Sequence, residues 1–110
     1  MDYLKKINAA FLNMLMCETD SYQLVTDIEF YSEEHGSGLQ GDYYDKDGLF
    51  IKYADYRNCT NILGFIMEWQ SDLKENKKWN KSQFITFKNG HFEVKTWWDE
   101  DFQKELYPYG

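Results

Sequence analysis

The run GDYYDKDGLFIKY, residues 41–53, places three aspartates and a glycine among aromatic residues, as a calcium-binding loop would. An EF-hand loop needs oxygen ligands at its first, third and fifth positions, glycine at the sixth and glutamate at the twelfth. If Gly48 is the sixth residue, Asp45 and Asp47 stand at ligand positions. The twelfth position is then Ala54, so the bidentate carboxylate is missing. We therefore predict that the chain has no metal site and no cofactor.

A turn between two strands explains the same run better. Lys46, Asp47 and Gly48 suit a three-residue hairpin loop in which the glycine takes the left-handed conformation. The resulting register sets Asp42 opposite Lys52. It also puts three residues on the core side of the sheet: Leu49, Ile51 and Tyr53.

Two histidines are the remaining candidates for acid–base chemistry. His35 follows two glutamates, and His91 lies in a second predicted turn. A histidine beside a carboxylate can act as a general acid and base, but an imidazole at a hairpin turn is usually only solvated. Cys17 and Cys59 have no nucleophile motif around them. We predict no catalytic residues and no enzyme; a small enzyme that uses His35 or His91 is the weaker alternative.

Hydrophobic periodicity predicts the helices that would support these residues. Leu4, Ile7 and Phe11 recur at helical spacing and predict a first helix over residues 3–17. A second apolar stripe predicts a helix over residues 58–77, and Asp99 would start a short last helix. The residues of that second stripe are Ile62, Phe65, Ile66, Trp69 and Leu73.

Alternating residues predict a strand that begins after residue 21. Leu24, Thr26, Ile28 and Phe30 would face the core, and the residues between them would face outward. The HGSG turn then returns the chain, and pairing Glu34 with Leu39 sets Tyr31 opposite Asp42 and Glu29 opposite Tyr44.

A second hairpin follows from Asn89-Gly90, read as a two-residue turn with Lys88 paired to His91. This register places Trp98 inside and Trp97 outside. It puts Ile85, Phe87, Phe92 and Val94 on one face, and Phe84 with Glu93 and Lys95 on the outer one. The whole chain, residues 1–110, is then a single α+β domain. We expect an antiparallel sheet of about five strands, in the order helix, three strands, helix, two strands, short helix, with the helices packed on one face.

The negative charge is concentrated in one segment. The chain carries a net charge of −7, and residues 18–55 hold ten acidic residues against Lys46 and Lys52, a net of −8. This excess argues against nucleic acid or an anionic membrane as a direct partner, and it favours a cationic protein. With no signal-peptide pattern, no apolar run of membrane-spanning length and no cysteine framework, we expect a cytoplasmic protein.

Carboxylates and aromatic residues should be displayed together on the outer face of the sheet. Carboxylates steer a cationic partner and aromatic side chains anchor it, as a protein-binding surface requires. The predicted partner-binding residues are Asp27, Glu29, Tyr31, Glu33, Asp42, Tyr44, Phe50 and Trp97.

The motifs also occur in a characteristic order. After an amphipathic helix come a tyrosine-rich strand with a D-K-D-G turn, an aromatic-rich helix, a tryptophan before a T-F strand, and an F-x-V strand that runs into acidic residues. In this chain they are Tyr43–Gly48, Trp79, Thr86-Phe87, Gly90, Phe92–Val94 and Asp99–Asp101. This order resembles the YezG-type immunity proteins of bacterial polymorphic toxin systems, which serve secreted or contact-dependent toxins.

The resemblance implies a cytoplasmic protein that binds and neutralises a cognate toxin domain, often a nuclease, in a 1:1 complex. It supplies no active-site residues. A nuclease cleft that holds a polyanion is positive, and an acidic surface complements it. An acidic decoy that inhibits a nucleic-acid-binding protein outside any toxin pair remains an open alternative.

Overall fold

The computed structural model describes residues 3–32 and 35–107 and gives one α+β unit. Its elements follow the expected order of helix, three strands, helix, two strands and short helix, with one extra 3-10 turn. They are α1 (Tyr3–Met16), β1 (Gln23–Ser32), β2 (Gly36–Tyr44), β3 (Phe50–Tyr53), α2 (Thr60–Asp72), η1 (Glu75–Lys77), β4 (Lys81–Phe87), β5 (Phe92–Trp97) and α3 (Glu100–Leu106). The second helix therefore ends five residues earlier than predicted.

The five strands form one antiparallel sheet in the order β3-β2-β1-β4-β5. The first three strands are a meander, and α2 then carries the chain back across the sheet so that β4 pairs with β1. As a result β1 is the central strand and β3 and β5 are the two edges. The residues that β1 carries therefore have neighbours on both sides.

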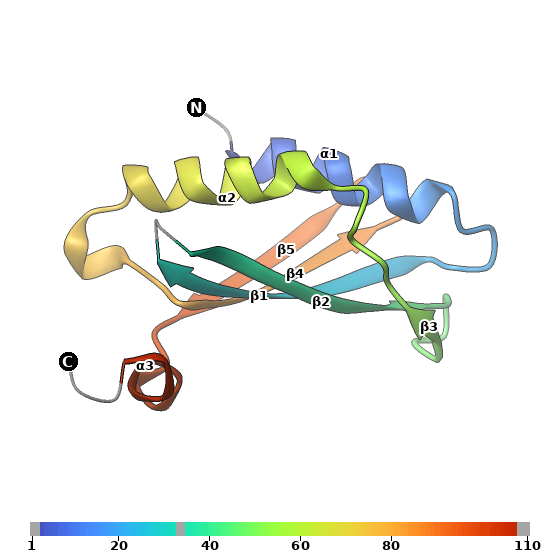
Figure 1. Ribbon diagram of the computed structural model, residues 1–110. Helices are drawn as coiled ribbons and strands as arrows, with labels where there is room; N and C mark the ends of the chain where they lie inside the picture. The colour runs from blue at the N-terminus through green and yellow to red at the C-terminus, as the bar shows by residue number, and fades with distance from the viewer. Residues whose placement is uncertain (1–2, 33–34, 108–110) are drawn as a thin grey trace.

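Helices α1 and α2 lie together on one face of the sheet, and α3 lies on the other (Figure 1). The expectation that the helices share one face thus holds for α1 and α2 but not for α3. The core fills the space between the two long helices and the inward side of the sheet. Its fully buried members include Ile7, Phe11, Leu15, Leu24, Ile28, Ile62, Ile66 and Phe84.

The alternation predicted for β1 is confirmed, but its register with β2 is not. Leu24, Thr26 and Ile28 are buried as expected. Glu29 lies opposite Gly38, and Tyr44 lies opposite Gln23, so the expected Glu29–Tyr44 and Tyr31–Asp42 pairs are wrong. β1 ends and β2 begins earlier in the chain than predicted, with Ser32 opposite Gly36, and this shifts every pair. Of the predicted Glu34–Leu39 pair, Glu34 lies outside the described residues, and Leu39 lies opposite Ile28.

The turn between β2 and β3 is confirmed, with a different register beyond it. Gly48 has a φ of +81°, and the Asp45 carboxylate accepts hydrogen bonds from the backbone N–H groups of Asp47 and Leu49. An irregularity after Tyr43 then shifts the pairing, so that Asp42 lies opposite Tyr53 and not Lys52. Leu49 and Tyr53, predicted to face the core, are 64% and 76% exposed, while Ile51 packs against the core as predicted.

The β4–β5 hairpin has a three-residue loop and not a two-residue one. The N–H of Phe87 donates to the carbonyl of His91, and Gly90 takes a φ of +94°. This one-residue difference turns β4 over, because neighbouring residues of a strand face opposite sides of the sheet. Phe84 is therefore buried, Ile85 and Phe87 do not face the core, and Phe92 and Val94 pack against it as predicted. Trp98, predicted to be inside, is 46% exposed.

A buried polar contact fixes this hairpin under α1. The Thr86 hydroxyl donates to Asn8 Oδ1 over 2.9 Å, and Asn8 Nδ2 donates to the carbonyl of Gly90 over 3.1 Å. Asn8 interrupts the apolar stripe of α1, yet it is buried because both ends of its amide are satisfied. Within the described residues, no helix combines the length and the apolar character that crossing a membrane requires.

Candidate functional site

The outward face of the sheet, opposite α1 and α2, displays seven of the eight predicted partner-binding residues. Along each strand these residues alternate with the residues that face the core. Their side chains therefore lie on the far side of the sheet from the core. The eighth residue, Glu33, lies outside the described residues. The seven are Asp27, Glu29, Tyr31, Asp42, Tyr44, Phe50 and Trp97.

These seven residues do not form one cluster. Trp97 lies on the edge strand β5, opposite Lys81, and Phe50 lies on the other edge strand, opposite Tyr44. Four strand spacings separate β5 from β3, which is about 19 Å across the sheet. Tyr31 and Tyr44 also lie near opposite ends of β1, because Tyr44 pairs with Gln23. The face therefore has an α3 end and a β3 end.

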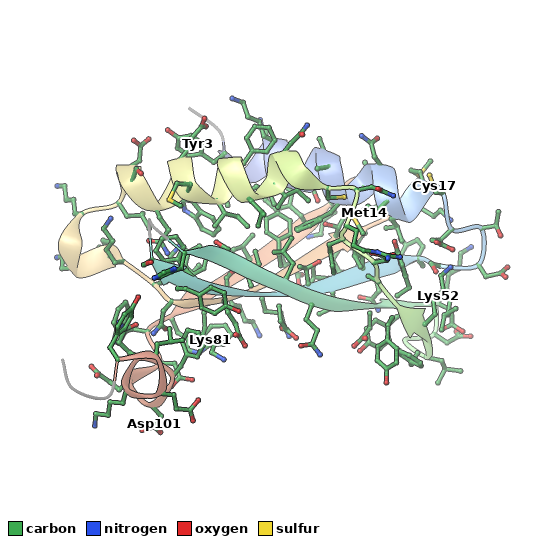
Figure 2. All side chains as sticks on the ribbon, in the orientation of Figure 1. Tyr3, Met14, Cys17, Lys52, Lys81 and Asp101 are labelled. Atoms are coloured by element: carbon green, nitrogen blue, oxygen red, sulfur yellow. The ribbon has the colours of Figure 1, made fainter. Side chains whose placement is uncertain are left out.

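At the α3 end the chain binds its own charges. The amine of Lys81 lies 3.3 Å from Glu29 Oε1 and 4.4 Å from the centre of the Phe102 ring. The ring of Tyr31 lies 6.0 Å from that of Phe102, so α3 covers this part of the face. Figure 2 shows Lys81 on the side of the sheet where α3 lies. The Glu29 carboxylate is balanced by a cation of the same chain.

The sequence of α3 explains why it forms there. Asp99 caps the helix, since its side chain accepts a hydrogen bond from the N–H of Phe102 over 3.0 Å. Asn80 holds the cap in turn, donating from Nδ2 to the Asp99 carbonyl and accepting from the Asp99 N–H at Oδ1. Acidic residues follow in the first turn and Lys104 in the last, as the helix dipole favours.

The β3 end carries exposed aromatic residues beside carboxylates. We call this set, Asp27, Asp42, Tyr44, Phe50 and Tyr53, the β3-end patch. The Phe50 ring lies 6.3 Å from Tyr44 and 5.2 Å from Tyr53, in edge-to-face arrangements in both cases. Phe50 is 51% exposed, and Tyr53 still more. The three rings form one continuous aromatic surface on the edge strand and its neighbour.

Electrostatics link the two carboxylates of the β3-end patch to its rings. The Tyr44 hydroxyl donates to Asp42 Oδ2 over 3.2 Å. Desolvation, the charge and hydrogen bond of Asp42 and the charge of Asp27 together raise the pKa of Tyr44 above its ordinary value. Both aspartates are thus close enough to act on one phenol, and they create a negative potential beside the rings.

Around Asp27 and Glu29 the outward face is hollowed only slightly, whereas a larger hollow of about 440 Å³ at its α3 end is lined by Tyr31, His35, Leu106 and Tyr107. One hollow of about 200 Å³ and another of about 100 Å³ adjoin Asp27 and Glu29. Sites for small molecules are usually clefts of roughly 300–1,000 Å³ that enclose most of the ligand. The surface around Asp27 and Glu29 therefore suits contact with a protein surface better than enclosure of a small substrate.

A larger open cleft of about 570 Å³ lies elsewhere, where the loop before α2 meets β2. Its charged groups, Asp55 and Arg57, bind each other, and this contact lowers the pKa of the Asp55 carboxyl. The Tyr56 hydroxyl is hydrogen-bonded to Thr26 over 2.7 Å. Burial, and then the charge of Asp55, raise the pKa of the Cys59 thiol, which keeps it protonated and weakly nucleophilic. The cleft does not present an activated nucleophile.

The two histidines do not converge. His35 follows the end of β1, whereas His91 pairs with Phe87, whose partner on β1 is Gln23 at the other end. His91 Nε2 lies 3.8 Å from Glu93 Oε1, and both side chains are exposed. Among the described residues, no three His, Cys, Asp or Glu side chains gather in a way that would hold a metal ion.

Besides Ile85 and Phe87, which β4 turns outward, the sequence does not predict the contacts that Tyr53 and Lys81 make on this face. Tyr53 was expected in the core, and only the irregularity between Tyr43 and Tyr44 turns it outward beside Phe50. The contact of Lys81 with Glu29 does not follow from the local sequence, because it depends on the pairing of β1 with β4. A basic residue at the start of a strand was the available signal, but nothing local showed which acid it would meet.

Comparison with known proteins leaves the family open. No protein-family model matches this chain, and no match is found among curated proteins. The likeness to YezG-type immunity proteins therefore remains a hypothesis drawn from the order of sequence motifs.

Proposed function

We propose that this chain is an immunity protein that binds the toxic domain of a bacterial effector in the cytoplasm. It forms a 1:1 complex and inhibits without turnover. The observation that supports this most is the β3-end patch, where Asp42 and Asp27 lie beside exposed rings on one face. Buried aromatic anchors dominate the affinity of many interfaces, and charges beside them steer the partner.

The charge of the chain favours a basic partner. With a net charge of −7, the molecule attracts cationic proteins and repels nucleic acid at long range. A toxin that cleaves nucleic acid must itself bind a polyanion, so its working surface is positive. An acidic face with aromatic anchors would cover such a surface by complementing its charge.

The test uses the toxin domain encoded beside this chain. We expect the purified proteins to co-elute as a 1:1 complex in size-exclusion chromatography, with an association rate that falls as salt increases. The double variant Asp27→Asn, Asp42→Asn should slow association and weaken protection. Glu93→Gln together with Glu100→Gln is the matched control, since it removes the same charge from the β5 edge and α3.

Three outcomes would count against the proposal. If no complex forms, the immunity function is wrong. If the double variant and the control reduce protection equally, only net charge matters and the β3-end patch is not the interface. If the chain captures many unrelated basic proteins with equal affinity, a general acidic decoy describes it better.

A further inference from the structure

The α3 end shows how this face holds a cation. Lys81 places its amine against the Phe102 ring and within 3.3 Å of the Glu29 carboxylate. A cation over an aromatic ring and beside a carboxylate gains from both the ring quadrupole and the ion pair. At this end the side chain of Lys81 thus interacts with both the Phe102 ring and the Glu29 carboxylate.

The β3-end patch also places carboxylates beside aromatic rings. Its Asp27 lines a hollow together with Lys81, whereas Asp42 lies opposite Tyr53 and accepts a hydrogen bond from Tyr44. The outward positions of β2 and β3 that the structure describes carry neither lysine nor arginine; they are Gly38, Gln40, Asp42, Tyr44, Phe50 and Tyr53. The lysine of β3, Lys52, belongs to the other face, where it binds Glu18 at 2.7 Å and lies over the Tyr43 ring. Figure 2 labels it at the β3 end of the sheet.

The charge of the patch selects among possible occupants. A second copy of this chain would bring its own Asp27 and Asp42 against the same acidic surface, and like charges in contact are unfavourable. The further acids of the β2–β3 turn, Asp45 and Asp47, add to that repulsion. A cationic side chain from another protein is attracted instead.

We propose that the β3-end patch binds an arginine side chain from a loop of the partner protein; this rests on the proposed function and locates its contact. The guanidinium would stack on the rings of Phe50 and Tyr53 and pair with the Asp42 carboxylate. Arginine fits better than lysine, because its planar group both stacks on aromatic rings and donates two parallel hydrogen bonds to a carboxylate. Asp42 retains capacity beyond the bond from Tyr44, since a carboxylate accepts at about four positions.

The proposal can be tested without the toxin. The probe is N-acetyl-arginine amide, titrated at low salt into the full chain while backbone amide shifts are followed by NMR. We expect saturable shifts confined to β2 and β3 around Asp42 and Phe50, with N-acetyl-lysine amide binding about threefold more weakly. Shifts spread over all acidic segments, or equal for both probes, would overturn the proposal.

Substitutions then assign the contact. Asp42→Asn and Phe50→Ala should each weaken arginine binding by about threefold or more, while Trp97→Ala at the opposite edge should leave it unchanged. Phe50 is half exposed, and the amide spectrum of each variant verifies that the fold is intact. Unchanged arginine binding by both patch variants would contradict the proposal.

Two further experiments, sedimentation and toxin inhibition, separate this inference from its alternatives. If the chain dimerises with increasing concentration in sedimentation, and Phe50→Ala abolishes the dimer, the patch binds a second copy of the chain and not an arginine of another protein. If arginine binds the patch but the toxin domain is not inhibited, the immunity function fails and the arginine site stands. If the toxin is inhibited and arginine does not bind, the immunity function stands and the arginine site is wrong.

Discussion

Lys81 and Glu29 stand on neighbouring strands, 52 residues apart in the chain, with 3.3 Å between the amine and the carboxylate. Their contact distinguishes the α3 end of the outward face from the β3 end. At the α3 end the negative charge of Glu29 is balanced within the molecule. At the β3 end Asp27 and Asp42 lie beside exposed aromatic rings.

The Glu29–Lys81 pair should make a measurable contribution to stability. A double-mutant cycle with Glu29→Gln and Lys81→Met should give a coupling of about 0.5–1 kcal/mol in the free energy of unfolding, because the pair is partly shielded but still reached by solvent. Urea unfolding measures it. The same cycle on His91 and Glu93 is the control. Their side-chain nitrogen and oxygen atoms are farther apart, at 3.8 Å, and both side chains are exposed, so the coupling should be near zero.

Asn8 should be needed for the stability of α1 on the sheet. Asn8→Ala removes the partner of the buried Thr86 hydroxyl and of the Gly90 carbonyl, which should lower the free energy of unfolding by about 1–3 kcal/mol. Asn13→Ala, on the exposed side of the same helix, is the matched control and should change it little. Equal unfolding midpoints for the two variants in urea would contradict the role of Asn8.

Two glycines should respond oppositely to the same substitution. A Cβ at Gly41 would lie well inside van der Waals contact of the Tyr56 hydroxyl and of the Val25 carbonyl oxygen. Gly41→Ala should therefore cost about 2 kcal/mol or more. At Gly64 in α2 a Cβ meets no atom within 4 Å, so Gly64→Ala should raise stability by up to about 1 kcal/mol. Thermal unfolding compares the two, and a tolerated Gly41→Ala would show that β1 and β2 can move apart.

Alkaline pH should weaken the fold through Tyr43. Burial first, and then the charge of Glu18, raise the pKa of Tyr43 from 10.0 to about 12. The unfolded chain therefore ionises this phenol at a lower pH than the folded chain does. The stabilising effect is fully present below pH 10 and is lost as pH rises from 10 to about 12.

The measurement is the urea midpoint between pH 8 and pH 11.5. Tyr43→Phe should show a smaller fall above pH 10 than the unmodified chain, because its ring cannot ionise. The two proteins should differ little in pH dependence below pH 9. A fall of the same size in both would mean that other groups cause the alkaline loss.

Local patterns were sufficient for the types and the order of the helices and strands, but not for the length of the β4–β5 loop or the end of α2. The spacing of Ile7 and Phe11 predicts α1, and Ile62 and Ile66 predict α2, because a helix brings residues three and four apart onto one face. Alternation places Asp27 and Glu29 outward on β1. Gly48 and Gly90 mark turns, because both adopt a positive φ that suits glycine.

What the tertiary structure decided was which strands pair and in which register. Sequence reasoning paired Lys88 with His91, and one extra loop residue was enough to exchange Phe84 with Ile85 as the core residue. Such a slip reverses every side chain of a strand, and the nearby residues alone do not forbid it. The choice is made by packing across the molecule, as where Asn8 of α1 binds Thr86 and Gly90.

The sequence by itself therefore determined the element types, the acidic character and the outward direction of Asp27 and Glu29. Only the tertiary structure placed β4 beside β1, which gave Glu29 a lysine and left Asp27 and Asp42 with the aromatic rings. The physical reason is the separation along the chain of the residues that interact. Helix and strand periodicity arise from neighbouring residues, whereas contacts between distant segments depend on how the whole core packs.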